Sequence, residues 1–227
     1  PLTSPLVSIT NSFLLVILFL QFVFHSYTTG FTLVNGNNTA KAEEYSIQEK
    51  QVFYSLGAIS YAACVGAFPL VLTNRYTLRS PLTEFIVRKL LPAPLLGLMS
   101  AFTAAVVRSP DFEHGIEVMD RNGKVVGVSQ KAGEKAVRET ALSRGVLFGT
   151  TFFLPNVLTH FVQRAKFVKT PRTLAVVRML FIMLVLSGML PASFSMFPQR
   201  GEIKRADLEL EILSSTEETV LFYNRGI

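Results

Sequence analysis

The sequence predicts an all-α polytopic membrane bundle of about five transmembrane helices, several of them kinked at proline, with a small β-hairpin insertion between the third and fourth helices. Five stretches contain no Asp, Glu, Lys or Arg: 1–40, 51–74, 90–107, 145–163 and 179–199. Each reaches the roughly 17–25 residues that a helix needs to cross a bilayer. Because soluble helices normally keep a polar face, five such windows exclude most classes of soluble enzyme.

The first two spans are predicted at about 5–24 and 51–73. The first is nearly all apolar, and Gln21 is its largest polar side chain. A less apolar stretch, 25–39, follows it and ends in Asn-Gly-Asn-Asn, which is typical of a turn. The second span is rich in Gly, Ala and Ser, and such small residues permit close contact between membrane helices.

The other three spans are predicted at about 85–107, 142–163 and 174–197. Kinks are expected at four prolines within them: Pro92, Pro94, Pro155 and Pro191. A proline frees a backbone carbonyl, which is tolerated in a membrane only where protein or a water-lined cavity covers it. Broken helices recur in transporters, although they also occur in bundles that transport nothing.

The charged segment 108–139 is predicted to lie outside the bilayer. Within it, two short runs of β-forming residues flank Asn122-Gly123, the strongest short signal for a hairpin. A polar helix from about 130 to 144 is expected to run directly into the fourth span. Residues 200–227 are interpreted as a polar tail of mixed charge, and the whole of 1–227 as one membrane domain.

The distribution of basic residues predicts the orientation. In a five-span chain the loops 74–89 and 163–172 share a side with the amino terminus, and together they hold eight Lys or Arg against one Glu. The opposite loops hold about equal numbers of each sign. The positive-inside rule therefore places the amino-terminal side inward and the carboxyl tail on the other face.

No catalytic constellation stands out in the sequence. The three histidines, His25, His114 and His160, are far apart, and no motif of a serine hydrolase, P-loop NTPase, zinc protease or dinucleotide-binding fold is found. The one cysteine, Cys64, lies in a chain whose spans contain no carboxylate, so no metal-ligand set converges there. We expect no enzymatic activity, no cofactor and no bound metal. The net charge of +6 resides in loops beside the helices, so no nucleic-acid partner is expected.

Polar residues inside membrane spans are costly, so they indicate either hydrogen bonds between helices or a path for a solute. The candidates for such a path are Gln21, Ser26, Ser100, Thr103 and Asn156. A single Ser or Thr is more often a structural contact, whereas the two amides offer both a donor and an acceptor with longer reach. Arg144, at the start of the fourth span, is expected to extend its guanidinium to the interface.

Several segments resemble the sideroflexins, a family of mitochondrial inner-membrane proteins. The segment 115–129 looks like the family's hairpin, and Ser143-Arg144 with Pro155 fits its fourth span. Pro191 is similar to the exit of its fifth span, and 224–227 to its tail. The family's amino-terminal region, with its His-Pro-Asp motif, has no counterpart, so we expect a fragment or a processed form.

Within the family, 135–150 and 216–223 are most similar to the fourth vertebrate branch. The resemblance implies a multi-pass protein of the mitochondrial inner membrane. In that membrane, the orientation predicted from the basic residues puts the carboxyl tail toward the intermembrane space. It also implies transport of a small solute, such as an amino acid. The fourth branch is associated with respiratory complex I assembly and iron–sulfur metabolism. The alternative is therefore a non-transporting membrane factor that supports complex I assembly and iron homeostasis, with respiratory-chain assembly factors as partners.

Serine is the less favoured solute. Family members that carry serine are expected to have Asn at several positions near the exit of the first span and in the third. This chain has other residues there: Phe24, Thr28, Thr32, Ser100 and Thr103. A hydroxyl reaches less far toward a zwitterionic solute than an amide does, and Phe offers neither donor nor acceptor.

Overall fold

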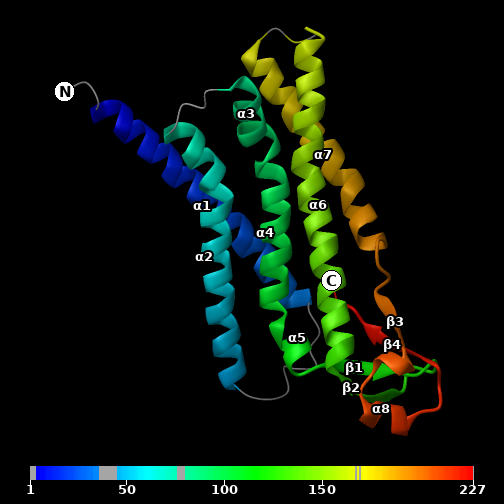
Figure 1. Cartoon of the computed structure of the whole chain (residues 1–227). Helices are drawn as coiled ribbons and strands as arrows, with labels where there is room; N and C mark the ends of the chain where they lie inside the picture. Colours follow the sequence, from blue (N-terminus) through cyan, green and yellow to red (C-terminus); the bar gives the residue numbers. More distant parts are fainter. Residues whose placement is uncertain (1–3, 36–44, 76–79, 167, 169, 227) are drawn as a thin grey trace. The chain divides into compact units, whose positions relative to one another are not determined.

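The computed structural model describes residues 4–35, 45–75, 80–166, 168 and 170–226. Within these residues, five helical stretches are long and apolar enough to cross a membrane, as the sequence predicts: Leu15–Asn35, Lys50–Pro69, Leu82–Val107, Gln130–Arg164 and Pro171–Ser195. Four of them lie in helices α1 (Ser4–Asn35), α2 (Tyr45–Arg75), α6 (Gln130–Arg164) and α7 (Pro171–Ser195), and the third ends with α4 (Pro92–Val107) (Figure 1).

Helix α1 extends beyond the apolar segment that predicted it. The less apolar stretch from residue 25 continues as helix to Asn35. Its buried side consists of His25, Thr28, Thr29 and Thr32, whose spacing of three and four residues places them on one face. The Thr32 hydroxyl donates to the Thr28 carbonyl at 2.9 Å, so it is satisfied inside the helix. Except for Asn35, the predicted Asn-Gly-Asn-Asn turn lies outside the described residues.

The third span is interrupted near its start. It consists of α3 (Pro81–Phe85), the π-helix η2 (Ile86–Leu90) and α4. The Leu91 N–H donates to the Ile86 carbonyl at 2.8 Å, which closes the wide turn just before Pro92. Pro92 and Pro94 have no N–H to donate, so an irregular turn at this place follows from the sequence. Pro155 lies inside α6 and Pro191 inside α7; the kinks at the four prolines stay predictions.

Four strands form one antiparallel sheet in the order β2-β1-β4-β3 (Figure 1). The strands are β1 (Ile116–Met119), β2 (Val125–Ser129), β3 (Arg200–Lys204) and β4 (Val220–Asn224). The turn between β1 and β2 contains Gly123, whose φ of 81° suits the Asn-Gly pair. Strand β4 pairs with β1 on one side and with β3 on the other. The interpretation of 200–227 as a polar tail overlooked two strands that complete this sheet.

The sheet has its own apolar core. It consists of Ile116, Val118, Ala132, Ala136, Ile203, Leu208, Ile212, Leu221 and Tyr223. The Tyr223 phenol donates to Glu139 Oε2 at 3.0 Å, and its burial, together with that carboxylate, raises the pKa of Tyr223. The ring lies over Gly201, where a Cβ would overlap it. The short helix α8 (Leu210–Ser215) places Ile212 against Gly127 of β2.

The chain forms two compact units. One contains Pro1–His25, Ser60–Ser100 and Arg144–Ser193; the other contains Ser26–Ile59, Ala101–Ser143 and Phe194–Ile227. The four-stranded sheet belongs entirely to the second unit.

Candidate functional site

The helices bury polar groups that have no hydrogen-bond partner among the described residues. These atoms include Gln21 Oε1 and Thr151 Oγ1 in the first unit, and Thr29 Oγ1 and Ser55 Oγ in the second. Lipid offers such atoms no hydrogen bonds, and a buried polar atom without a partner costs free energy. Water or a polar solute inside each unit would satisfy them.

The two candidates on α1 have different surroundings. Gln21 lies beside α2, where Gly66 leaves room for its side chain: a Cβ on Gly66 would be 3.0 Å from Gln21 Oε1. Ser26 is half-buried and belongs to the second unit. Next to it, Thr28 and Thr29 are buried, and neither was among the five path candidates predicted from the sequence. Their helical spacing from Thr32 could have identified them once the first helix was extended to Asn35.

The candidates on α4, Ser100 and Thr103, are buried and lie one turn apart on the same face of the helix. Helix α4 approaches α6 closely a turn earlier. A Cβ on Gly97 would be 2.6 Å from the Gly145 carbonyl oxygen and 2.9 Å from the Gly149 Cα. The absence of a side chain at Gly97 therefore lets the two backbones meet.

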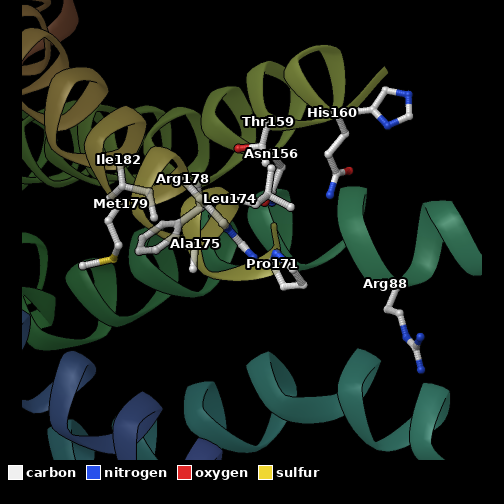
Figure 2. Close-up of a pocket in the computed structure, with 12 residues that line it drawn as sticks. Arg88, Asn156, Thr159, His160, Pro171, Leu174, Ala175, Arg178, Met179 and Ile182 are labelled. Carbon is white, nitrogen blue, oxygen red and sulfur yellow. The ribbon is translucent and has the colours of Figure 1, made fainter. Parts of the chain in front are cut away.

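A pocket of about 520 Å³ lies in the first unit, between α6, α7 and η2 (Figure 2). It is lined by Arg88, Phe152, Asn156, Thr159, His160, Gln163, Pro171, Leu174, Ala175, Arg178, Met179 and Ile182. Asn156 is the candidate that the pocket contains, whereas the other four candidates, all described residues, do not line it. The structure does not bring the five candidates together into one site.

The polar groups of this pocket come mainly from α6. Asn156, Thr159, His160 and Gln163 follow the same spacing of three and four residues on that helix. The Thr159 hydroxyl donates to the Pro155 carbonyl at 2.6 Å, so it is already satisfied. The His160 ring packs against Phe85, with ring centroids 5.1 Å apart.

Two arginines approach the same pocket. Arg88 pairs with Glu84 at 2.9 Å, and both side chains are about half exposed. Arg178 lies on α7 among Pro171, Leu174 and Ala175 (Figure 2). Arg178 was not predicted as a site residue, because the charge-free window begins one residue later, although the predicted span begins at 174. A single charge inside an apolar span is the signal that could have identified it.

Arg144 differs from its prediction. Only 8% of the residue is exposed, so its side chain lies within the protein and does not extend outward. It follows directly on the polar part of α6, and the neighbouring Ser143 hydroxyl donates to the Thr140 carbonyl at 2.9 Å.

A buried ion pair between Arg108 and Asp111 lies in the second unit. Arg108 is 3% exposed and donates to Asp111 Oδ2 from Nε at 2.8 Å and from Nη2 at 2.6 Å. It also donates to Thr140 Oγ1 at 2.7 Å and to the Arg225 carbonyl at 2.6 Å. Burial raises the pKa of Asp111, while the Arg108 charge and hydrogen bonds lower it in part. Arg108 thereby joins the exit of the third span to α6 and to the residue after β4.

No group of three or more His, Cys, Asp or Glu side chains that could hold a metal ion occurs among the described residues. Cys64 is exposed on α2. The expectation that the chain binds no metal stays a prediction.

Long apolar helices with buried polar groups define a multi-pass helical membrane protein. Residues 2–227 match the family model described as Sideroflexins. The chain belongs to the sideroflexin family. It is 43% identical to Sideroflexin-4 of Danio rerio over 100% of its own length and 73% of the relative's. It is 38% identical to Sideroflexin-4 of Homo sapiens over 89% of its length and 58% of the relative's.

A more distant relative is Sideroflexin-5 of Homo sapiens, 30% identical over 76% of this chain and 51% of the relative. The chain therefore spans about half to three quarters of the length of these proteins. No solved structure matches it.

Proposed function

We propose that the chain is the membrane part of a mitochondrial inner-membrane transporter of a small solute, such as an amino acid, with serine as the less favoured solute. The observation that carries the proposal is the buried polar face of α1, formed by His25, Thr28, Thr29 and Thr32 in a helix without a charged residue. Polar groups that face the interior of a membrane bundle are expected along solute pathways. Membership in the sideroflexin family supports the same role.

The candidate path residues are taken for each unit by itself: Gln21 and Ser100 in the first unit, and Ser26, Thr29 and Thr103 in the second. Hydroxyl and amide groups both donate and accept hydrogen bonds, so they can replace water around the ammonium and carboxylate groups of an amino acid. Asn156 lines a different pocket and contributes only there.

Replacing Thr29 with Val tests the path. The change keeps the shape of the side chain and removes a hydroxyl that has no partner among the described residues. Uptake of a panel of labelled amino acids into proteoliposomes that hold the full-length protein is expected to fall about tenfold, the effect of one lost hydrogen bond to a solute.

Thr150→Val is the matched control. The Thr150 hydroxyl donates to the Val146 carbonyl of its own helix at 2.6 Å, so its removal is expected to leave uptake unchanged. Equal uptake by wild type and Thr29→Val would contradict the proposed path. If the wild-type protein moves no solute in the panel, the transport function itself is wrong.

The second candidate is a non-transporting factor that supports complex I assembly and iron homeostasis, with respiratory-chain assembly factors as partners. The sheet favours it, because β2 and β3 are edge strands whose outer sides could pair with a partner strand. Val125 and Val128 of β2 are 46% and 52% exposed. Rescue of complex I in knockout cells by the full-length Thr29→Val protein, together with absent flux, would favour this function over transport.

We further propose that the loops 74–89 and 163–172 face the matrix and that the sheet lies outside the bilayer, toward the intermembrane space. Strand β1 pairs with β4, so the segment 116–129 and the carboxyl-terminal strands must share one side. Two spans, α6 and α7, lie between β2 and β3 in the sequence. Two crossings return the chain to the side of the membrane from which it started, as the shared sheet requires.

Protease protection of tagged protein tests this orientation. A tag in the turn at Gly123 is expected to be cleaved once the outer membrane is opened, and a tag in 163–172 only after the inner membrane is opened. A protein that carries only an epitope after β4, with no tag at Gly123 or in 163–172, provides the control. Cleavage of both tags at the same step would rule out the five-span topology.

A further inference from the structure

We propose that the pocket between α6 and α7 binds the phosphate of an anionic phospholipid, with Arg178 as its counter-ion. The site lies outside the proposed solute path, and it rests on three observations: the depth of Arg178 in α7, the charges of the pocket wall, and the separation of polar from apolar lining residues.

Arg178 follows Pro171, the first residue of α7, by seven residues, which corresponds to about 10 Å along the helix axis. The 25 residues of α7 measure roughly 37 Å, close to the thickness of a bilayer with its headgroups. The Arg178 backbone therefore lies near the edge of the hydrocarbon, from which its long side chain reaches the level of lipid phosphates. A guanidinium at this depth requires an anionic partner or a wet cavity.

The pocket wall provides no such anion. None of the described residues that line it is acidic, and the Glu84 carboxylate nearby is paired with Arg88. On the other wall, Asn156 and Gln163 carry amide N–H groups that can donate to a phosphate oxygen. At this end of the pocket, α6 ends in Arg164, and basic residues beside a membrane attract anionic headgroups.

The apolar part of the pocket suits an acyl chain. Met179 and Ile182 lie at one end of the pocket, away from Arg88 and His160 (Figure 2). From Met179 the apolar surface continues along α7 through exposed residues: Leu180, Met183 and Leu184. In the most apolar 18-residue window of this span no residue is buried by the rest of the described chain, and an exposed apolar helix face in a membrane meets lipid. A headgroup at the polar end and a chain along α7 occupy the pocket together.

Lipid retention by Arg178→Gln tests the site. The purified full-length protein is titrated with phosphatidylglycerol, and bound lipid is counted by native mass spectrometry. The substitution removes a charge-assisted contact, so the affinity is expected to fall about tenfold or more. Arg178→Lys keeps the charge without the planar fork, and an intermediate loss is expected.

Arg172→Gln is the matched control, because Arg172 lies on the same helix, carries the same charge and does not line the pocket. A change of less than about twofold is expected there, since a rim charge contributes little to affinity. Equal losses in the two variants would overturn the proposal, because the attraction would then come from net charge alone. Equal retention of phosphatidylcholine would overturn it as well.

A photoactivatable phosphatidylglycerol keeps the proposal testable if Arg178→Gln does not fold. On the wild-type protein, label is expected in the peptides that contain 152–163 and 171–182, and a phosphatidylcholine probe is expected to label them much less. Label spread evenly over all five spans would contradict the site. Loss of label in the presence of excess inorganic phosphate would assign the pocket to a soluble anion instead of a lipid.

Discussion

Replacing Arg108 with Leu is expected to lower the free energy of unfolding by about 3–5 kcal/mol. The substitution leaves the Asp111 carboxylate buried without its cation and removes the donors to Thr140 and to the Arg225 carbonyl. Reversible denaturation in mixed detergent, followed by circular dichroism, measures the loss. Arg88→Leu is the control, because its pair with Glu84 is about half exposed and such pairs contribute about 0–1 kcal/mol.

The Arg108→Leu defect should also depend on pH. Burial raises the pKa of Asp111, and removal of Arg108 takes away the charge that opposes this rise. A carboxyl whose pKa is raised in the folded state stabilises the fold when protonated, and this contribution is lost as the pH rises through the folded-state pKa. The defect is therefore expected to shrink as the pH falls from neutral toward the unfolded-state value of 3.8. A defect of the same size at every pH would show that the lost contacts are not electrostatic.

Gly97→Ala is expected to cost about 1–3 kcal/mol, because the added methyl group would press on the backbone of α6. The atoms that it would meet are the Gly145 carbonyl oxygen at 2.6 Å and the Gly149 nitrogen at 3.0 Å, neither of which can turn aside as a side chain can. Thermal unfolding in one detergent measures the cost.

Gly149→Ala is the control for this pair of glycines. The nearest atom to a Cβ there is the Gly97 Cα at 3.8 Å, an ordinary contact. Because Ala is also the better helix former, this substitution is expected to be neutral or slightly stabilising. If both alanines cost the same, the close approach of α4 and α6 is not what Gly97 provides.

The membrane helices could be predicted because charge is excluded from them over windows of the right length. The end of α1 could not, because Thr28, Thr29 and Thr32 read as polar, and only the burial of that face explains why they continue the helix. The π-helix at 86–90 could likewise not be predicted from the sequence. Two prolines mark an irregularity at this place, but its form depends on how the chain joins α3 to α4.

The sheet was half predictable. Asn122-Gly123 is a local signal that needs no knowledge of the rest of the chain. Strand β3 contains one strongly apolar residue, Ile203, and its pairing depends on β4, which lies about twenty residues later. Long-range pairing of this kind leaves no periodic pattern in a strand of five residues. For the candidate site, amides were easy to select from the sequence, but the sequence did not indicate that Asn156 lines a pocket with residues of α7 and η2.

The position of β4 in the sheet has a consequence for biogenesis. It is an interior strand, yet it is the last of the four to be synthesised, after all five apolar helices have left the ribosome. Until then β1 and β3 each lack the pairing that β4 provides. Unpaired strand edges of this kind are bound by chaperones and are open to proteases. The sheet can therefore be completed only after all of these membrane helices have been synthesised. A chain truncated before Val220 would insert its helices but would lack β4, so its unpaired strand edges would expose it to degradation.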